Sequence, residues 1–252
     1  RNDIGWRGNF TAVTTPFKQN GDVDEALFQQ NIDLLIQEGI DGIIPSGSTG
    51  EVSSLTDSER VRLYELTVEV VAGRVPIVAG TAHVNTDMAV ALSKKAKAIG
   101  ADGLMLTPPH YALPNEREVF EHFQEVSSQV DLPILVYNNP GRVGISIPAT
   151  SLAKIAKIEN VVAVKESSKD FSDFVATLRL CRNEVKIFDG LSMIRGFPTA
   201  VMGADGFVSS VDSPVMGKEA VDFYEVCTSG DNEAAQKLQF KLLGLEALAA
   251  RG

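Results

Sequence analysis

The feature that most constrains the fold of this chain is a regular alternation of short apolar segments with longer amphipathic ones. Eight segments resemble strands because they are rich in apolar residues and are bounded by glycine, proline or other turn residues. They lie at residues 10–14, 42–45, 75–79, 102–106, 132–137, 161–164, 185–188 and 206–209. A segment with helical spacing of apolar residues follows each one, at residues 24–38, from 56 onward, and at 86–99, 116–129, 148–157, 171–181, 192–202 and 214–227.

This alternation predicts a parallel sheet with helices outside it, and eight strand–helix units predict a closed (β/α)8 barrel, the TIM barrel of the α/β class. An open doubly wound sheet is the alternative, but no GxGxxG fingerprint follows the first strand. The length of 252 residues suits one such domain. We therefore expect the barrel over residues 1–230, with residues 231–252 as the start of a C-terminal helical extension.

Charge and cysteine content narrow the choice of partner and compartment. The net charge of −10 and the pI near 4.8 argue against nucleic acid or an anionic membrane as a partner. Cys181 and Cys227 are the only cysteines, and both lie in predicted helices, so we expect no disulfide framework. The first ten residues lack the apolar core of a signal peptide, and no run approaches the roughly 18 apolar residues of a membrane span. The sequence thus predicts a cytoplasmic protein.

Lys165 follows directly after the sixth predicted strand, at the end of a barrel where active sites are built. Lysine is rarely buried, so its place there needs a reason. A purely structural reason would be that its ammonium reaches solvent at the strand end or pairs with Glu166. The sequence of this strand, taken alone, favours that structural explanation. A partly desolvated lysine can instead lose its proton and attack a ketone to form a Schiff base.

Polar groups at other strand ends favour the chemical interpretation. Tyr137 ends the fifth strand, and Arg142 lies in the loop after it. Ser48 and Thr49 lie in a glycine-rich loop after the second strand, where hydroxyls and backbone amides can bind a carboxylate. The arginine fork suits a carboxylate as well. Together they predict imine chemistry on an anionic oxo acid, with Lys165 as nucleophile and Tyr137 as proton relay.

The sequence predicts neither a metal nor a cofactor for this chemistry. The three histidines, His83, His110 and His122, show no metal-ligand spacing, and there is no CxxC pair. A pyridoxal phosphate enzyme would also use a lysine. It would need a phosphate cup after strands seven and eight, where Asp189 and Gly190 place an anion instead.

Three motifs now stand in a distinctive order and spacing along the eight units. They are Gly47-Ser48-Thr49-Gly50-Glu51, Tyr137-Asn138-Asn139-Pro140-Gly141-Arg142 and Val164-Lys165-Glu166. Their conjunction resembles the dihydrodipicolinate synthase / N-acetylneuraminate lyase family. The resemblance implies a (β/α)8 barrel that acts as a class I, metal-independent lyase or synthase on pyruvate or a related 2-oxo acid. It also implies a homotetramer built from two tight dimers.

The resemblance assigns a role to each matching residue. Lys165 would form the Schiff base with pyruvate, and Tyr137 would move protons to and from the imine and the aldehyde. Ser48 and Thr49 would bind the pyruvate carboxylate and connect Tyr137 to Tyr111 through a hydroxyl relay. In synthase-type members the residue matching Tyr111 enters the site of the neighbouring subunit.

Further matches concern the substrate-facing backbone and the branch of the family. Gly190 and Val208 match positions whose backbone faces the bound substrate. Arg142 matches the arginine with which the synthase branch holds the carboxylate of its second substrate. In contrast, Ser48 stands where synthases usually carry threonine, and His110 replaces a tyrosine that commonly precedes the one matching Tyr111.

Two other departures concern regulation and length. The loop through Asp57 and Arg60 lacks the histidines found where lysine binds in feedback-inhibited synthases, so we expect no such inhibition. The chain ends at Gly252, short of the helices that usually complete the C-terminal domain of the family, so either further residues of the extension are missing here or this member has a shorter one.

The expected activity is 4-hydroxy-tetrahydrodipicolinate synthase-like condensation of pyruvate with aspartate semialdehyde, a step of lysine biosynthesis. Cleavage, dehydration or deamination of a 4-hydroxy-2-oxo acid, or of a sugar-derived 2-keto-3-deoxy acid, uses the same imine and is the alternative within the class. A barrel that binds an oxo acid without turnover is the alternative of another class. The side chains that select the aldehyde follow strands five to eight, and their directions cannot be read from the sequence.

Overall fold

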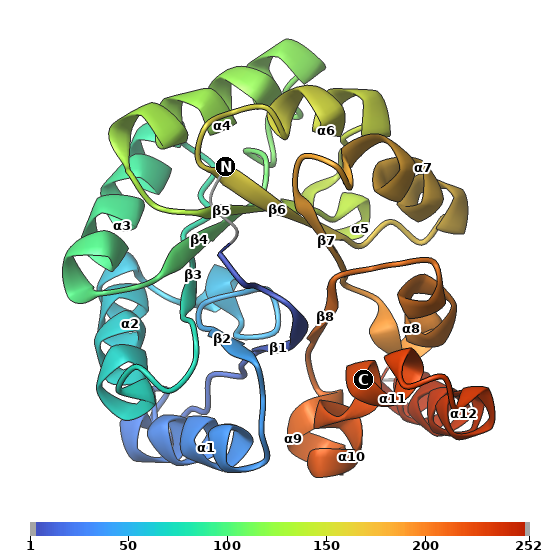
Figure 1. Cartoon of the computed structure of the whole chain (residues 1–252). Helices are drawn as coiled ribbons and strands as arrows, with labels where there is room; N and C mark the ends of the chain where they lie inside the picture. Colours follow the sequence, from blue (N-terminus) through green and yellow to red (C-terminus); the bar gives the residue numbers. More distant parts are fainter. Residues whose placement is uncertain (1–3, 250–252) are drawn as a thin grey trace.

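In the computed structural model, which describes residues 4–249, eight parallel strands form a barrel with helices around it (Figure 1). The strands are β1 (Gly8–Ala12), β2 (Gly42–Ile44), β3 (Val78–Gly80), β4 (Gly103–Leu106), β5 (Ile134–Asn138), β6 (Val161–Glu166), β7 (Lys186–Asp189) and β8 (Gly206–Ser209). They pair in the order β2-β1-β8-β7-β6-β5-β4-β3. A parallel bridge between Ile43 and Ile77 joins the two ends of this order and closes the ring. The predicted (β/α)8 barrel is confirmed.

Most of the predicted helices are present on the outside of the barrel. They are α1 (Glu25–Gln37), α2 (Asp57–Val71), α3 (Thr86–Ile99), α4 (Glu116–Gln129), α6 (Ala149–Ile155), α7 (Phe171–Cys181) and α8 (Ser192–Val201). The predicted capping box at the start of α2 forms, because Thr56 and Glu59 each accept a hydrogen bond from the other's backbone amide. Two short elements were not predicted, the 3-10 helix η1 (Val52–Ser54) and α5 (Pro140–Val143).

The region after β8 departs from the prediction of one helix over residues 214–227. It forms three short helices, α9 (Asp212–Met216), α10 (Lys218–Val221) and α11 (Phe223–Thr228). The first break lies at Gly217, whose φ of 58° and ψ of −139° are outside the helical region and are available to glycine. The prediction of a continuous helix there was wrong.

The last helix, α12 (Asn232–Ala249), packs against α8 and α11 beside the barrel (Figure 1). It forms the expected helical extension as far as the structure describes it. The boundary at residue 230 stays a prediction. Residues 1–3 and 250–252, which fall within the predicted barrel and extension, lie outside the described residues.

The pleat of the strands separates two layers of side chains, and this separation positions the site. On β6, Ala163 packs inside the barrel, whereas Val164 belongs to the core between the sheet and the helices. Lys165 and Glu166 continue this alternation beyond them. The inner layer consists of Trp6, Phe10, Ala12, Ile44, Val78, Met105, Leu135, Tyr137, Ala163, Phe188 and Val208. The side chain of Lys165 is therefore directed inward and that of Glu166 outward.

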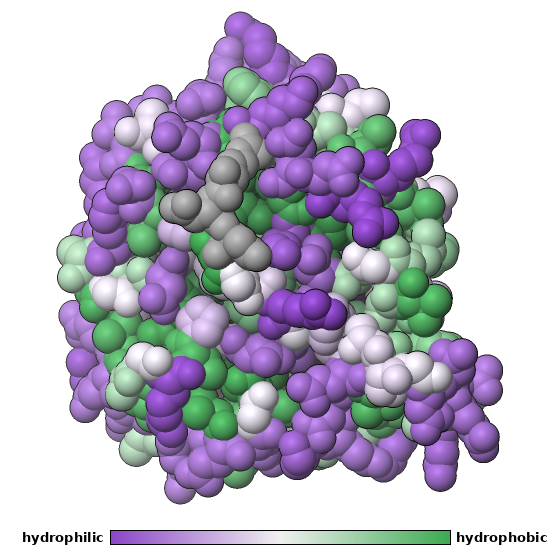
Figure 2. All heavy atoms as spheres, in the orientation of Figure 1, coloured by the Kyte–Doolittle hydropathy of each residue, from purple (hydrophilic) through white to green (hydrophobic). Residues whose placement is uncertain are grey.

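The face of the molecule seen in Figure 2 is mostly hydrophilic at its edge, with hydrophobic residues visible between the polar ones. Both cysteines are free and buried. Among the described residues, no helix has the length and apolar character that crossing a membrane requires.

Candidate active site

Lys165 and Tyr137 lie next to each other at the C-terminal ends of β6 and β5. The two residues are partners in the parallel register, and their side chains are inside the barrel. The Lys165 Nζ lies 3.9 Å from the centre of the Tyr137 ring. Each residue is only 5% exposed. The predicted adjacency of amine and phenol follows from parallel strands that end at the same rim.

The Tyr137 hydroxyl is held by polar neighbours. Asn139 Nδ2 donates a hydrogen bond of 2.6 Å to it. Burial by itself would raise the pKa of this phenol. The Lys165 charge, together with hydrogen bonds from Asn139, Lys165 and Ser48, outweighs burial and lowers the Tyr137 pKa below its ordinary value. A phenol with a lowered pKa is a better proton relay near neutral pH.

A cavity of about 440 Å³ opens at this rim. The predicted site residues that line it are Lys165, Tyr137, Ser48, Thr49, Arg142, Gly190 and Val208. These residues come from loops or strand ends that are up to 160 residues apart in the chain, from Ser48 to Val208. The fold thus brings together every predicted site residue except Tyr111.

Tyr111 is placed differently from the other predicted residues. Its side chain is 93% exposed, and its φ of 74° lies in the left-handed region. It does not line the cavity around Lys165. Its predicted entry into the site of a neighbouring subunit, and the relay through Ser48 that depends on it, stay predictions.

Gly190 lies directly against the side chains of Lys165 and Ser167. A Cβ built on Gly190 would overlap Ser167 Oγ and would lie 2.7 Å from Lys165 Cε. A larger residue at this position would therefore displace the side chain of Ser167 or of Lys165.

Several cavity residues were not singled out from the sequence. Asn139 lies two residues after Tyr137 in the Tyr-Asn-Asn-Pro-Gly-Arg motif, so the sequence already placed it close to the Tyr137 hydroxyl that it contacts. Ser167 is buried, lines the cavity, and its hydroxyl has no hydrogen-bond partner among the described residues. Glu246 reaches the same cavity from α12, and no pattern in the sequence indicates this.

A second cavity of about 510 Å³ adjoins the first and shares Ser48, Tyr137 and Arg142 with it. Its wall includes Arg60, which donates two hydrogen bonds of 2.9 Å to the carbonyls of Gly80 and Ala82. Across residues 4–249, no group of three or more His, Cys, Asp and Glu side chains is arranged to hold a metal ion.

The sequence and the fold match known proteins over nearly the whole chain. A 4-hydroxy-tetrahydrodipicolinate synthase of Syntrophobacter fumaroxidans is 36% identical over 240 residues, which cover 95% of this chain and 81% of that protein. An uncharacterized DapA-like lyase of Rhizobium meliloti is 39% identical over 237 residues, or 93% of this chain and 77% of that protein.

Solved structures give the same result. The dihydrodipicolinate synthase of Aquifex aeolicus superimposes with a TM-score of 0.90 at 32% identity, over 95% of this chain and 81% of that one. A structure described as the first monomeric dihydrodipicolinate synthase variant has a TM-score of 0.89 at 32% identity, over 95% and 80%. The sequence model of the dihydrodipicolinate synthetase family matches residues 6–251. This chain is a lyase that belongs to the dihydrodipicolinate synthetase family.

Proposed function

We propose that Lys165 forms a Schiff base with pyruvate and that the resulting enamine reacts with an aldehyde. The observation that carries this proposal is the buried Lys165 amine, 3.9 Å from the centre of the Tyr137 ring, in a cavity lined by hydroxyls and one arginine. The neutral amine attacks the keto carbon, and the carbinolamine loses water to give the imine. Loss of a proton from the pyruvate methyl carbon then gives the enamine.

The remaining steps form one carbon–carbon bond and restore the lysine. The enamine carbon attacks the aldehyde carbon, and a proton is transferred to the aldehyde oxygen. Water then hydrolyses the imine and releases the product from Lys165. Tyr137 is the group placed to carry protons in both directions, because its hydroxyl interacts with Lys165, Asn139 and Ser48.

The other cavity residues bind the substrates in this proposal. Ser48 and Thr49 hold the pyruvate carboxylate through hydroxyl and backbone donors. The backbone at Gly190 and Val208 faces the substrate. Arg142 is exposed at the junction of the two cavities, where its planar guanidinium can bind a carboxylate of the incoming aldehyde.

Aspartate semialdehyde is the aldehyde that we propose, in a 4-hydroxy-tetrahydrodipicolinate synthase-like reaction. The names of the synthase relatives and the position of Arg142 support this choice. The second candidate reaction is cleavage of a 4-hydroxy-2-oxo acid that carries further hydroxyl groups. The observation that favours it is Ser167, whose unpartnered hydroxyl could bind a substrate hydroxyl next to Lys165.

Two measurements test these steps separately. Exchange of the pyruvate methyl protons in D2O, followed by proton NMR, reports the imine and enamine without any aldehyde. We expect exchange with the unaltered protein and none above the buffer rate with Lys165→Ala. A panel then compares pyruvate plus aspartate semialdehyde with cleavage of several 4-hydroxy-2-oxo acids. Cleavage much faster than condensation would overturn the choice of aspartate semialdehyde.

We further infer that Tyr111 completes the site of a second copy of this chain. Its 93% exposure, on a loop beside the second cavity, supports this role. A mixture of the Lys165→Ala and Tyr111→Phe variants should then recover activity, because one site of a mixed dimer has both residues intact. Activity of the mixture equal to the sum of its two components would contradict the inference.

A further inference from the structure

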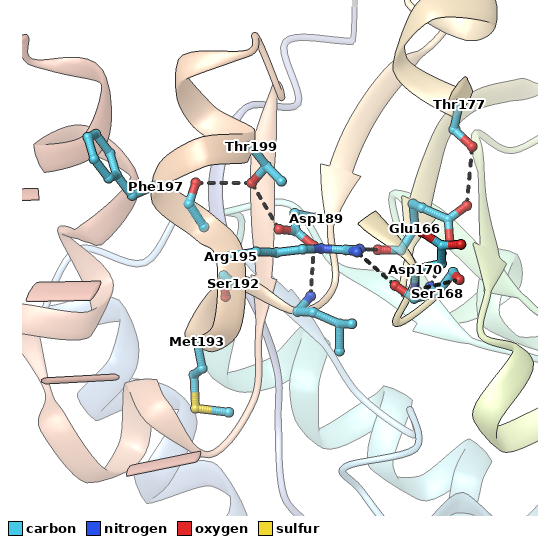
Figure 3. Close-up of polar contacts among 12 residues, drawn as sticks. Glu166, Ser168, Asp170, Thr177, Asp189, Ser192, Met193, Arg195, Phe197 and Thr199 are labelled. Carbon is cyan, nitrogen blue, oxygen red and sulfur yellow. Dashed lines mark hydrogen bonds and ion pairs between the residues drawn. The ribbon is translucent and has the colours of Figure 1, made fainter. Parts of the chain in front are cut away.

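A network of buried polar side chains lies behind the active-site wall, between the sheet and helices α7 and α8. Figure 3 shows Arg195 of α8 at its centre, with its guanidinium between Asp189 of β7 and the end of β6. Arg195 is only 6% exposed and Asp189 is fully buried. A buried ion pair is expensive to desolvate and is often replaceable by apolar residues without loss of stability. Stability is therefore a weak explanation for this pair.

The three hydrogen bonds of the guanidinium all go to the ends of these two strands. Nε donates to Asp189 Oδ1 at 3.1 Å. Nη1 donates to the carbonyl of Ser168 at 2.7 Å, and Nη2 donates to the carbonyl of Glu166 at 3.2 Å. The same group lies 5.2 Å from the centre of the Phe174 ring. These three hydrogen bonds and the contact with the Phe174 ring hold the guanidinium in one position.

Its partners are held in turn. Asp189 Oδ1 accepts a second bond from the Leu191 amide at 2.9 Å, and Oδ2 accepts one from Thr199 Oγ1 at 2.9 Å. Glu166 accepts bonds from the Ser168 amide at 2.7 Å and from Asn138 Nδ2 at 2.8 Å. Burial raises the pKa of the Asp189 carboxyl, and the adjacent Arg195 charge opposes that effect.

The two strand ends that Arg195 joins are the ones that contact the catalytic lysine. The carbonyls of Glu166 and Ser168 flank Ser167, and Asp189 directly precedes Gly190. Ser167 and Gly190 both line the cavity, and Gly190 packs against the Lys165 side chain. A shift of either strand end would therefore move the wall against which the lysine rests.

We propose that Arg195, through its contacts with Asp189 and with the carbonyls of Glu166 and Ser168, is a positioning residue that holds Lys165 in its reactive arrangement and keeps Ser167 and Gly190 against it. The inference rests on the proposed function, because it assumes that Lys165 forms the imine. Arginine is suited to the task, since its rigid fork reaches both carbonyls and the carboxylate at once. A lysine at this position can keep the ion pair but not all three contacts.

Two altered proteins separate positioning from folding. Arg195→Lys keeps a positive charge beside Asp189 and loses the forked contacts to the carbonyls. The double variant Asp189→Leu with Arg195→Met removes both charges, so that no unpaired charge remains buried. Ile32→Ala, a core change in α1 away from the site, is the matched control for lost stability.

The readout is exchange of the pyruvate methyl protons in D2O, per folded molecule, over a range of pyruvate concentrations and well below each thermal midpoint. We expect both Arg195 variants to exchange about tenfold or more slowly at saturating pyruvate. We also expect the double variant to remain slow even if its thermal midpoint is close to that of the unaltered protein. Ile32→Ala should keep the unaltered rate despite a lower midpoint.

One result would contradict the positioning role of Arg195, and a different result would contradict the proposed function. If the unaltered protein exchanges protons and Arg195→Lys and the double variant do so at the same rate, the positioning role is wrong while the proposed function stands. If the unaltered protein shows no exchange above buffer, the proposed function fails and the role of Arg195 fails with it. If the double variant does not fold, the slow or unchanged rate of Arg195→Lys still decides the question.

Discussion

The Lys165 ammonium lies 3.9 Å from the centre of the Tyr137 ring, and the two residues are partners on adjacent parallel strands. The face of an aromatic ring attracts a cation, so the two side chains are in cation–π contact. The same charge helps to lower the Tyr137 pKa against the effect of burial. The Lys165 charge therefore helps to set the acidity of the phenol beside it.

Replacing Tyr137 by phenylalanine should separate imine formation from proton transfer. The ring that covers Lys165 remains, but the hydroxyl that exchanges protons is lost. We expect the rate of pyruvate methyl exchange to fall by about 10²–10⁴-fold, the usual contribution of a general acid–base. Borohydride trapping of pyruvate should still occur at high pyruvate concentration. If Tyr137→Phe exchanges the methyl protons within about a factor of two of the rate of the unaltered protein, another group moves the proton.

Replacing Asn139 by alanine should change the pH dependence of turnover. Asn139 donates a 2.6 Å hydrogen bond to the Tyr137 hydroxyl, and this bond helps to lower the pKa of the phenol. Without it, the Tyr137 pKa should rise, and the part of the pH–rate profile that reports the phenol should move to higher pH. Asn160→Ala, which loses a bond to the Ser127 carbonyl away from the cavity, is the control. If the pH–rate profiles of Asn139→Ala and Asn160→Ala both coincide with that of the unaltered protein, Asn139 does not tune the Tyr137 pKa.

Adding one methyl group at Gly190 should disable the lysine without unfolding the protein. A Cβ there would overlap Ser167 Oγ and lie 2.7 Å from Lys165 Cε, so the lysine side chain must move. We expect Gly190→Ala to lose on the order of 10²-fold in pyruvate exchange, as small displacements of reacting groups do. Gly244→Ala is the control, because a Cβ on this α12 glycine meets nothing within 4 Å. Equal activity of the two variants would show that the contact is easily relieved.

His122 should make the folded state sensitive to acid. It is buried in α4 with Thr86 Oγ1 2.9 Å from its Nδ1, and burial lowers its pKa from 6.5 to about 4. The unfolded chain binds a proton at higher pH than the folded one. The stabilising effect is therefore complete above pH 6.5 and is lost as the pH falls toward 4, by roughly 3 kcal/mol in total.

Urea unfolding at pH 7 and pH 4.5 measures this effect. The unaltered protein should lose more free energy of unfolding between the two pH values than His122→Gln, in which the titrating ring is absent. The same loss in both proteins would assign the acid sensitivity to other groups, such as the carboxylates.

Local patterns were enough to predict the barrel and seven of the residues that line its cavity. The strand–helix alternation predicted all eight strands, and the parallel arrangement of the strand ends predicted Tyr137 beside Lys165. Contacts that join distant segments were not predictable in this way. Arg195 reaches β6 and β7 from a kink in α8 where its φ is −143°. Pro198 in the same helix is a sequence signal for the kink, but it does not indicate which residues Arg195 contacts. The break at Gly217 was missed because glycine is tolerated inside a helical pattern.

The central claim is that Lys165 carries pyruvate as a covalent imine. Reduction with borohydride in the presence of pyruvate, followed by digestion and mass spectrometry of the Lys165 peptide, tests it most directly. We predict that fragment-ion spectra of this peptide place one carboxyethyl group on Lys165, that Lys169 and Lys186 carry none, and that Lys165→Arg abolishes the labelling. An unmodified Lys165 peptide under saturating pyruvate would contradict the claim.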